Sequence, residues 1–579
     1  MSVYKKRYEE WLNRNDFDEW TKEELQFLKG NEEEIADRFH QDLAFGTAGM
    51  RGKIGVGTNR MNRYVVQRAT QGLANALHFF YPNKDRICVA IAYDSRRMSQ
   101  EFAEEAALTL AGNQIKAYLY PSLRPTPQLS FTVRELSCQA GINITASHNP
   151  PEYNGYKVYW SDGAQFSFPY DKKVKEEVDK ITDFSSIHIL SKKEAIQQGL
   201  FEEISADLDE RYEQIVLEQR IHPEISNQTN IKIVYTPLHG TGNIPVCRVL
   251  KKAGYTNLYV VPEQEMPDGN FPTVSSPNPE SAEAFSFALN LAKEKDADIV
   301  LATDPDADRL GIYVKHQGEY RAFTGNQSGA VLAEYLLSQK KAMNILDSKG
   351  MLFRSIVTTK LLDAVGRAYE IPVKEVLTGF KYIGQQILAL EEQQKYTYLF
   401  GMEESYGCLV GTYARDKDAV SAALLLTEAA AYYLLQGKTL WDVLEDMYQR
   451  YGYYVESVYS IELEGISGLQ RIQAILDYLR KNPLNTLDNY CVEKIRDYQQ
   501  GWCLNLQNHE KKSLDLEKTN VLYYELEEDT WLCVRPSGTE PKIKFYFGTK
   551  QNSLSSAEQK IKTLEKAILH YVQEGEKNK

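Results

Sequence analysis

Short apolar runs alternate with helix-like stretches in the first third of the chain. Residues 87–93 form a β-type run, residues 99–111 carry apolar side chains at helical spacing, and residues 115–120 form a second β-type run. Strands that alternate with helices are typical of βαβ units. The pattern therefore predicts a largely parallel sheet covered by helices in this region.

The same alternation restarts further along the chain. It begins with the β-type run 231–235, continues through a helix-like stretch at 246–253 and a strand at 258–261, and reaches an apolar strand at 298–302. This indicates a second α/β domain. Between these elements, residues 262–280 contain five prolines, which predicts a long irregular loop.

The second half of the chain predicts two further units. A third unit is expected from about residue 324 to residue 453, and it includes the apolar stretch 422–435. That stretch is interrupted by a threonine and a glutamate and is too short to span a bilayer, so we expect a buried helix. The remainder ends in apolar side chains at 561, 564, 568 and 571, a helical spacing, and is expected to form a smaller α+β domain.

Length and composition narrow the class of protein. A chain of 579 residues is too long for one hydrophobic core and predicts roughly three to five domains. The net charge of -13 opposes nucleic acid or an anionic membrane as a general partner. The seven cysteines include no Cys-x-x-Cys pair and are expected to be reduced. The amino terminus lacks the features of a signal peptide, so we expect a cytoplasmic protein.

An acidic run follows the apolar strand at 298–302. It reads Thr303-Asp-Pro-Asp-Ala-Asp-Arg309, and in an extended segment alternate side chains face the same side, so three carboxylates can converge. Such hard oxygen ligands suit magnesium. An EF-hand is excluded because Arg309 and Lys315 occupy the positions that need Gly and Glu. A solvated acidic turn is the alternative, but three unpaired carboxylates would repel one another.

A serine lies where another predicted strand ends. The segment Thr145-Ala-Ser-His-Asn-Pro150 follows the apolar residues 140–144, and its Asn-Pro-Pro ending favours a turn. Ser147 is therefore expected at the mouth of a sheet, where α/β enzymes place their sites. A Ser-His pair alone is a weak signal, because most such serines cap a turn. No Gly-x-Ser-x-Gly elbow surrounds it, so an acyl hydrolase is not supported.

A loop with two cations is predicted near the carboxyl end. The segment 535–542, Arg-Pro-Ser-Gly-Thr-Glu-Pro-Lys, combines two cations, two hydroxyls and a glycine after an apolar run. Such a loop can bind phosphate through backbone N–H groups, hydroxyls and a forked guanidinium. It is not a Walker A loop, and a plain turn with exposed charges is an equal alternative.

Two glycine runs partly match the dinucleotide fingerprint. The run that starts at His239 follows a strand, but Pro245 occupies the third glycine position, so the match fails. His239 itself is expected to be a structural residue. The run at 46–52 follows helix-like sequence and lacks the preceding strand, so it is expected to contribute Thr47 and Arg51 to an anionic substrate instead.

Three of these segments and a fourth at residues 401–407, in their order along the chain, resemble the α-D-phosphohexomutase superfamily. They are Thr-Ala-Ser-His-Asn-Pro, Asp-Pro-Asp-Ala-Asp-Arg, Gly-Met-Glu-Glu-Ser-Tyr-Gly and Arg-Pro-Ser-Gly-Thr-Glu-Pro. The likeness spans almost the whole chain. The opening Phe-Gly-Thr-Ala-Gly-Met-Arg-Gly is similar to the branch that contains bacterial phosphoglucomutases and the animal phosphoglucomutase-2 and phosphopentomutase enzymes.

The resemblance implies an α/β fold of four domains around a central cleft. Three related α/β domains with mixed sheets would be followed by a smaller α+β domain at the carboxyl end. Each domain would contribute one loop, in order the phosphoserine, metal-binding, sugar-binding and phosphate-binding loops. The boundaries expected on this basis are 1–208, 209–323, 324–455 and 456–579.

The resemblance also implies roles for individual residues. Ser147 would be the phosphoserine, and Ser147, Asp304, Asp306 and Asp308 would bind the metal. The reacting centre would be lined by His148, Lys157, Arg309 and Lys381. The proton acceptor stays open among His148, Lys157 and Lys381.

Substrate contacts are implied in the second half of the chain. Glu403 and Ser405 would hold sugar hydroxyls, and the nonreacting phosphate would be held by Arg535, Ser537, Gly538 and Thr539. Many relatives place Glu directly after Gly, whereas Met402 intervenes here. Alignment on Glu-x-Ser selects Glu403 and leaves Glu404 as a rival.

The implied activity is interconversion of α-D-glucose 1-phosphate and glucose 6-phosphate through a phosphoserine and glucose 1,6-bisphosphate. One Mg²⁺ per chain and glucose 1,6-bisphosphate as activator are expected. The partners would be small sugar phosphates rather than nucleic acid or membrane, and the chain would be a monomer or homodimer. The alternatives are a phosphopentomutase, a phosphomannomutase, a hexose-bisphosphate synthase, a metal-dependent phosphatase and a non-catalytic sugar-phosphate sensor.

Overall fold

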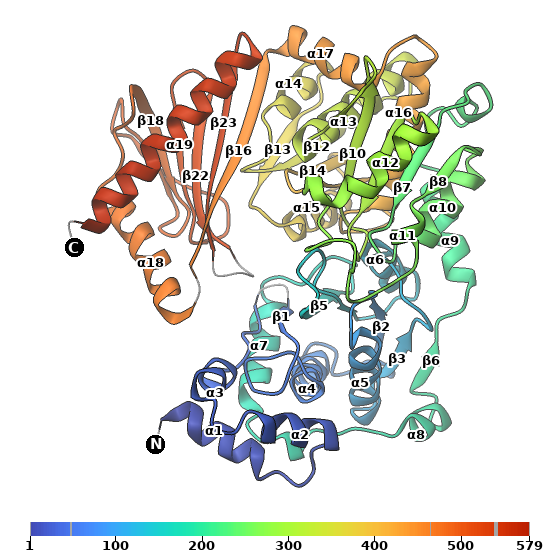
Figure 1. The fold of residues 1–579 in the computed structure, drawn as a ribbon, viewed down its shortest axis with the longest axis vertical. Helices are drawn as coiled ribbons and strands as arrows, with labels where there is room; N and C mark the ends of the chain where they lie inside the picture. The colour runs from blue at the N-terminus through green and yellow to red at the C-terminus, as the bar shows by residue number, and fades with distance from the viewer. Residues whose placement is uncertain (1, 47–48, 464, 538–541, 578–579) are drawn as a thin grey trace. The chain divides into compact units, whose positions relative to one another are not determined.

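The structure is a computed structural model that describes residues 2–46, 49–463, 465–537 and 542–577 (Figure 1). The chain divides into two compact units. The first consists of Met1–Phe323, Ile383–Gln394 and Tyr406–Gly437. The second consists of Thr324–Tyr382, Lys395–Ser405 and Lys438–Lys579.

A six-stranded sheet lies at the centre of the first part of unit 1. Its strands pair in the order β1 (Gly49–Lys53), β5 (Tyr153–Trp160), β4 (Ala140–Ile144), β2 (Cys88–Tyr93), β3 (Lys116–Leu119) and β6 (Phe201–Glu203). The pairs β2–β3, β2–β4 and β3–β6 are parallel, whereas β1–β5 and β4–β5 are antiparallel. The sheet is therefore mixed at one edge, where sequence periodicity alone predicted parallel strands.

Helices pack against this sheet, which accounts for the continuous apolar character of its central strands. All of β4 and nearly all of β2 are buried, as expected for strands that are covered on both faces. A Cβ on Gly72 would lie 2.8 Å from the backbone nitrogen of Val178, so α4 and α7 approach closely there. The helices are α4 (Arg63–Phe80), α5 (Ser99–Gly112), α6 (Thr126–Glu135), α7 (Tyr170–Lys180) and α8 (Lys192–Gln197), with the 3₁₀ turn η1 (Phe184–Ser186).

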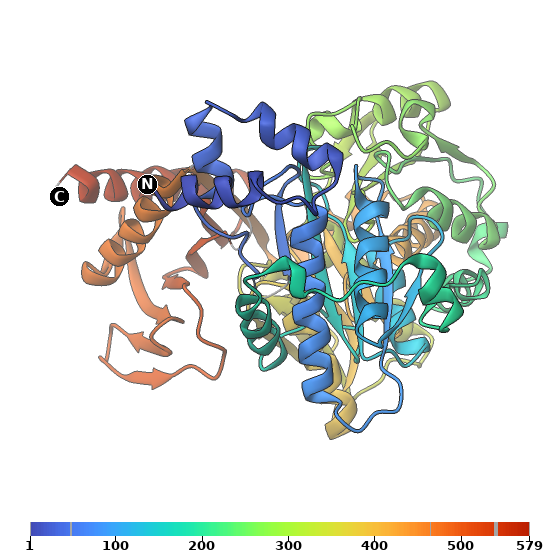
Figure 2. The same ribbon diagram turned by 90° about the horizontal axis from the view of Figure 1, so that it is seen from below.

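Three helices precede the sheet and have a small core of their own. Trp11 makes edge-to-face contacts with Phe17 and Phe39, with ring centroids 5.0 and 5.7 Å apart. The helices are α1 (Val3–Leu12), α2 (Glu19–Phe27) and α3 (Glu32–Phe39). In the view from below, this blue segment lies beside the long helix α4 (Figure 2).

The second sheet of unit 1 has five strands, in the order β11 (Glu319–Ala322), β10 (Leu310–His316), β9 (Ile299–Thr303), β7 (Ile233–Thr236) and β8 (Leu258–Val260). The strands β7, β8 and β9 are parallel, and β10 and β11 are antiparallel additions. The proline-rich loop also contains a short helix that the proline count did not predict. The helical elements are α9 (Asp207–Leu217), η2 (Ile225–Asn227), α10 (Asn243–Lys252), α11 (Pro262–Glu265), η3 (Ala282–Phe285) and α12 (Ser286–Lys295).

The predicted buried helix is α16 (Ala419–Leu434), and its apolar residues are almost all buried. It begins after Asp418, whose side chain accepts the N–H groups of Val420 and Ser421. It contacts α10 and β9 within unit 1. Among the described helices, none combines the length and the apolar character needed to cross a membrane.

Unit 2 begins with a parallel sheet in which β12 (Gly350–Ser355) pairs with β13 (Val373–Val376) and β14 (Thr397–Glu403). Helices α13 (Gly325–Ala342), α14 (Leu361–Ala368) and α17 (Leu440–Tyr451) belong to the same unit. The chain passes from unit 2 to unit 1 within α15 (Phe380–Gln393), and β15 (Gly407–Val410) belongs to unit 1.

The rest of unit 2 is the smaller α+β region that the sequence predicted. Its antiparallel sheet has the order β16 (Tyr453–Glu462), β23 (Lys542–Gln551), β22 (Thr530–Pro536), β21 (Leu522–Leu526), β18 (Tyr490–Asp497), β19 (Trp502–Asn505) and β20 (Lys511–Ser513), with β17 (Thr486–Leu487) paired to β18. The helices α18 (Gly465–Lys481) and α19 (Leu554–Lys577) share one hydrophobic core with these strands (Figure 1).

Candidate active site

Ser147 lies in a tight turn three residues after β4. Its backbone is in the left-handed region, with φ of 52°, and its N–H donates to the Thr145 hydroxyl over 2.8 Å. The Ser147 hydroxyl donates to Oδ2 of Asp304 over 2.6 Å and lies 3.2 Å from Nδ1 of His148. The predicted turn at the strand end is confirmed, and the serine is in direct contact with the acidic loop.

A buried arginine that the sequence analysis missed holds this turn. The Arg96 guanidinium donates to the carbonyl oxygen of Ser147 over 2.6 Å, and to that of Asn149. It also donates to the carbonyl oxygens of Pro150 and Tyr153, over 2.8 and 3.0 Å. One side chain thus fixes four carbonyl groups of the loop that carries Ser147.

Arg96 is itself held in a fully buried environment. Its Nε lies 3.4 Å from Oδ2 of Asp94, and its guanidinium stacks on the Phe271 ring, 5.0 Å from the centroid. Burial lowers the pKa of Arg96 to about 10, although the Asp94 charge opposes that shift. Burial also raises the pKa of Asp94. The pair is therefore a costly buried charge pair, and its arginine donates to four carbonyl groups of the serine loop.

The three aspartates follow β9 in a turn rather than in an extended segment. Oδ1 of Asp304 accepts the backbone N–H groups of Asp308 and Arg309, each over 3.1 Å. Ala307 between them has φ of 50°. The carboxylates converge as predicted, but the reason is this side-chain-capped turn and not the alternation of a strand.

The carboxylates are grouped closely enough to hold one metal ion. Oxygen atoms of Asp304, Asp306 and Asp308 lie within 4.8 Å of one another, and all three residues are buried. Burial and the neighbouring carboxylates raise the pKa of Asp304 well above its ordinary value. Among the described residues, Oδ1 of Asp306 and Oδ1 of Asp308 are buried and accept no hydrogen bond. A hard divalent cation fits this set of oxygen donors.

Three cationic side chains surround the aspartates. Lys157 on β5 donates to Oδ2 of Asp306 over 2.7 Å and lies 3.8 Å from Asp308. Lys417, which the sequence analysis did not select, lies 3.2 Å from Oδ2 of Asp308. Nε of Arg309 lies 3.8 Å from Oδ1 of Asp308. The site therefore combines dense negative charge with cations that can bind a phosphate.

His148 and Arg51 extend the site toward β1. Burial, assisted by the nearby Arg309 and Arg51 charges, lowers the pKa of His148 well below its ordinary value. Arg51 donates to Oδ1 of Asn149 over 2.6 Å. The run 46–52 follows helix α3, as the sequence indicated, and contains the start of β1. The pairing of β1 with β5 brings Arg51 opposite Gly155.

The candidate sugar-binding residues lie in unit 2. Oε1 of Glu403, at the end of β14, accepts the Gly379 N–H over 2.7 Å, two residues before Lys381. Oε2 of Glu404 accepts the hydroxyls of Ser355 and Thr358, over 3.2 and 3.3 Å. The two rival carboxylates are thus anchored differently, with Glu403 linked to the segment that carries Lys381.

Arg535 lies within the electrostatic reach of both carboxylates. Burial opposes its charged form, but Tyr546, Cys533 and the Glu404 and Glu403 charges outweigh burial and raise its pKa. The neighbouring Ser537 N–H donates to the Lys542 carbonyl over 2.7 Å. The sugar loop and the described start of the phosphate loop are therefore close together within unit 2.

Comparison with protein families assigns most of the chain. Residues 42–184, 210–318 and 324–451 match the phosphoglucomutase/phosphomannomutase α/β/α domains I, II and III. The chain belongs to the phosphoglucomutase/phosphomannomutase family. This confirms the resemblance to the phosphohexomutases and the expected fold class. It also makes the chain an enzyme of the sugar-phosphate mutase class, and membership of the family implies a bound metal ion.

Individual members of the family are similar over nearly the full chain. The phosphoglucomutase of Staphylococcus aureus strain MRSA252 is 38% identical over 533 residues, which is 92% of this chain and 94% of the relative. The enzyme of strain N315 is 37% identical over the same lengths. Among solved structures, a phosphomannomutase of Thermus thermophilus, described as putative, gives a TM-score of 0.68 at 20% identity over 92% of this chain and 99% of that one. The Paramecium phosphoglucomutase parafusin gives 0.68 at 18% identity, over 91% and 95%.

The site residues that the sequence predicted are divided between the two units of the chain. Unit 1 brings together Ser147, His148, Lys157, Arg309, Arg51 and the three aspartates. Unit 2 contains Lys381, Glu403, Ser405, Arg535 and Ser537. Thr47, Gly538 and Thr539 lie outside the described residues. Arg96 and Lys417 carried no motif signal of their own, because their contacts join segments that are distant in sequence.

His239 is held as a structural residue, as expected. Nδ1 lies 3.0 Å from the Met266 carbonyl, and Nε2 lies 2.9 Å from the Thr273 hydroxyl. Both ring nitrogens are therefore occupied within the proline-rich loop. This structural role agrees with the prediction that the glycine run starting at His239 does not bind a dinucleotide.

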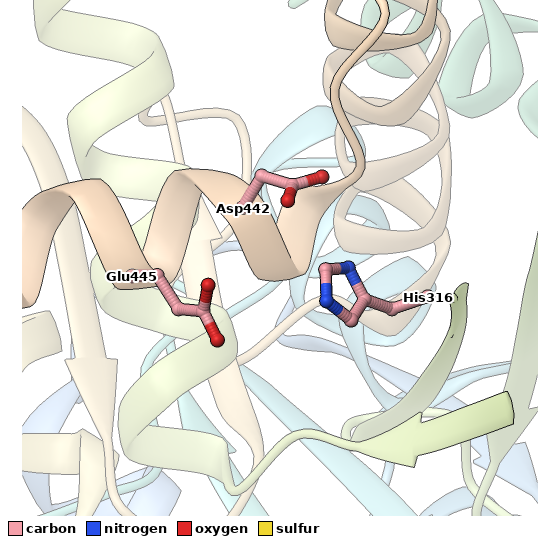
Figure 3. A group of neighbouring side chains, drawn as sticks. All are labelled: His316, Asp442 and Glu445. Carbon is pink, nitrogen blue, oxygen red and sulfur yellow. The ribbon is translucent and has the colours of Figure 1, made fainter.

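Figure 3 draws His316, Asp442 and Glu445, three residue types that can bind a metal ion. His316 belongs to unit 1, and Asp442 and Glu445 belong to unit 2, on α17. Asp442 already accepts the Thr439 N–H over 2.7 Å in the capping box of that helix. We assign no metal site to these residues.

Proposed function

We propose that this chain is a phosphoglucomutase that interconverts α-D-glucose 1-phosphate and glucose 6-phosphate, with Ser147 as the carrier of the transferable phosphate. The observation that supports this most strongly is the 2.6 Å hydrogen bond from the Ser147 hydroxyl to Asp304 in the three-aspartate loop. It puts a nucleophilic oxygen beside a potential metal site. The full-length relatives that are 37–38% identical are phosphoglucomutases.

A resident phosphate solves a geometric problem, because O1 and O6 lie on opposite sides of the sugar. In the first step, a free sugar hydroxyl attacks the phosphorus of phospho-Ser147. The bond from phosphorus to Ser147 Oγ breaks, a bond to the sugar oxygen forms, and the hydroxyl proton passes to a base. The product is glucose 1,6-bisphosphate, which also serves as the activator. After the bisphosphate turns over, Ser147 Oγ gives up its proton and attacks the other phosphorus. The bond from that phosphorus to the sugar oxygen breaks, the sugar oxygen takes a proton, and the phosphoenzyme is regenerated.

Charge is the main obstacle to this transfer. A phosphoserine adds about two negative charges at neutral pH, and it must meet an anionic substrate. We assign one Mg²⁺ to Ser147, Asp304, Asp306 and Asp308, where it would neutralise charge on the transferring phosphoryl group. Arg309 and Lys417 add positive charge from the protein side, next to Asp308.

Proton transfer at Ser147 has two candidate acceptors. Oδ2 of Asp304 accepts a hydrogen bond from the Ser147 hydroxyl, and Nδ1 of His148 lies 3.2 Å from Oγ. Lys157 is ion-paired with Asp306, so we assign it a charge-neutralising role and not that of the base. Lys381, which lies in the segment linked to Glu403, is the candidate partner of the sugar hydroxyl.

Substrate binding is assigned to the remaining predicted residues. Glu403 and Ser405 would bind sugar hydroxyls, and Thr47 and Arg51 would bind anionic substrate. The nonreacting phosphate would be bound by Arg535, Ser537, Gly538 and Thr539. On this proposal the four loops belong to domains 1–208, 209–323, 324–455 and 456–579. A cytoplasmic monomer or homodimer stays the prediction from the sequence.

The proposal is tested by the products of a substrate panel. The purified chain is incubated with the 1-phosphates of glucose, mannose, glucosamine and ribose, with Mg²⁺ and glucose 1,6-bisphosphate. We expect fastest isomerisation of glucose 1-phosphate, loss of that activity in Ser147→Ala, and normal activity in the control Ser161→Ala, where an exposed serine is removed. Faster turnover of ribose 1-phosphate, or release of inorganic phosphate in place of an isomer, would contradict the assignment.

A further inference from the structure

The proline-rich loop between β8 and η3 contacts both halves of the catalytic region of unit 1. The Ser276 hydroxyl donates to the carbonyl oxygen of His148 over 2.6 Å. Four residues later, Oε1 of Glu280 accepts a hydrogen bond from Nη1 of Arg309, also over 2.6 Å. A single loop is thus attached to the turn of Ser147 on one side and to the metal-binding loop on the other.

Only some of the N–H groups of Arg309 donate hydrogen bonds to described residues. Its backbone N–H donates to Oδ1 of Asp304, and its Nη1 donates to Glu280. Its Nε lies 3.8 Å from Oδ1 of Asp308, is buried, and makes no hydrogen bond to the described residues. A guanidinium has five N–H donors in a rigid fork, so it can bind one carboxylate and keep donors for a phosphate.

We propose that Glu280 is a positioning residue that holds the Arg309 guanidinium in place for the phosphate on Ser147. This inference rests on the proposed function of Ser147. An arginine side chain loses rotamer entropy when it is fixed. Because the Glu280 contact already restricts the side chain, less of that cost is left for the transfer step. The Ser276 contact anchors the same loop to the turn that carries Ser147.

The alternative is an ordinary surface ion pair. Glu280 is 35% exposed and Arg309 17% exposed at the side chain, and exposed pairs of this kind add little to folding stability. Substitution of Glu280 should therefore leave the fold intact. Catalysis and stability can then be separated in one set of variants.

The same segment offers a matched control. Oε1 and Oε2 of Glu283 accept the N–H and hydroxyl of Ser275, over 3.0 and 2.8 Å, and no described contact joins Glu283 to Arg309. Glu283→Ala loosens the loop without removing the partner of Arg309. Glu280→Gln keeps an oxygen acceptor at the position of Oε1 and removes the charge.

The experiment compares Glu280→Ala, Glu280→Gln and Glu283→Ala with the wild type in full-length protein. We measure kcat and KM for glucose 1-phosphate, the rapid-quench rate of phosphate transfer from the phosphorylated enzyme, and the melting temperature. We expect Glu280→Ala to lower kcat and the transfer rate roughly 10- to 100-fold with little change in KM. Glu280→Gln should recover much of the transfer rate, and Glu283→Ala should behave like the wild type.

Three outcomes would overturn the inference. They are a wild-type transfer rate in Glu280→Ala, an equal loss in Glu283→Ala, and a loss that follows the melting temperature. Failure of the proposed function gives a different result, because the wild-type enzyme would then take up no phosphate on Ser147. The role of Glu280 is tested by comparing transfer rates among variants that take up phosphate on Ser147.

Discussion

Lys157 donates a hydrogen bond to Oδ2 of Asp306 over 2.7 Å, and this contact joins β5 of the first sheet to the loop that follows β9 of the second. The Thr126 hydroxyl donates to the same oxygen over 2.8 Å. Oδ1 of Asp306 accepts no hydrogen bond from the described residues. One oxygen of this carboxylate therefore joins the two sheets, and the other is left for a cation.

Asp306→Asn should weaken metal binding more than it disturbs the fold. An amide preserves the shape of the side chain but removes the charge that a divalent cation requires. We expect the Mg²⁺ concentration for half-maximal activity to rise roughly tenfold or more. Mg²⁺ should also raise the melting temperature of the wild type but not of the variant. Asp296→Asn, at an exposed residue paired with Lys315, is the control, and equal Mg²⁺ responses in all three proteins would refute the site.

Arg96→Met should destabilise the protein and the turn of Ser147 together. The substitution leaves Asp94 buried without its cation and removes the donors of four carbonyl groups, a change worth about 3–5 kcal/mol. Denaturant unfolding should show the loss as a lower midpoint. The double variant Asp94→Asn/Arg96→Met should recover part of the stability and none of the phosphate uptake. A single variant with normal stability and normal uptake would contradict this account of the loop.

Gly407→Ala should lower activity through Lys417. A Cβ at position 407 would lie 1.9 Å from Cδ of Lys417, so the lysine side chain must move. Its ammonium then loses its place 3.2 Å from Asp308. We expect kcat to fall roughly 10- to 100-fold, as for other small misplacements of catalytic groups.

A double-variant cycle tests that route. If the effect of Gly407→Ala runs through the lysine, the variant Gly407→Ala/Lys417→Met should be no slower than Lys417→Met alone. Effects that multiply instead would show that Gly407 acts independently of Lys417. Melting temperatures of the three variants separate the loss of activity from a loss of fold.

Glu456 gives a prediction about stability and pH. Burial raises its pKa to about 7 from the ordinary 4.5, while the nearby Thr359 hydroxyl and Arg354 charge act in the opposite direction. Between about pH 4.5 and pH 7, the Glu456 carboxyl therefore keeps its proton in the folded protein and has lost it in the unfolded chain. The cost of ionising Glu456 is absent below pH 4.5, grows as the pH rises to 7, and reaches ~3 kcal/mol at most above that.

Glu456→Gln should therefore melt a few degrees above the wild type at pH 8 and at the same temperature at pH 4.5. Thermal unfolding at the two pH values measures this directly. Glu462→Gln, at an exposed residue near the end of the same strand, should show no such pH-dependent difference. A constant difference at both pH values would rule out ionisation of Glu456 as its cause.

The sequence predicted those features that depend on neighbours along the chain. The buried strands before Ser147 and Asp304, the buried helix α16 and the final helix were all read from apolar spacing, because local periodicity reflects which face is buried. The antiparallel position of β5 was not predicted by periodicity, because strand direction depends on pairing. The mixed sheets were predicted from the resemblance to the phosphohexomutase superfamily.

Contacts between distant segments escaped the sequence analysis. Arg96 and Glu280 act on Ser147 and Arg309 from other parts of the chain, and a lone arginine or glutamate is usually a surface residue. Lys417 is similar, since it reaches Asp308 only because β15 contains a glycine at the crossing point. The convergence of the three aspartates was predicted for the wrong geometric reason, because a turn and not an extended strand brings the carboxylates together.

The most direct test of the account is the position of the transferable phosphate. The purified chain is incubated with glucose 1,6-bisphosphate labelled with ³²P, digested, and mapped by mass spectrometry, and a second sample is chased with unlabelled glucose 1-phosphate. We predict label on Ser147 alone, transfer of that label to sugar phosphate during the chase, and no label in Ser147→Ala. Label on another residue, or label on Ser147 that the chase does not remove, would contradict the central claim.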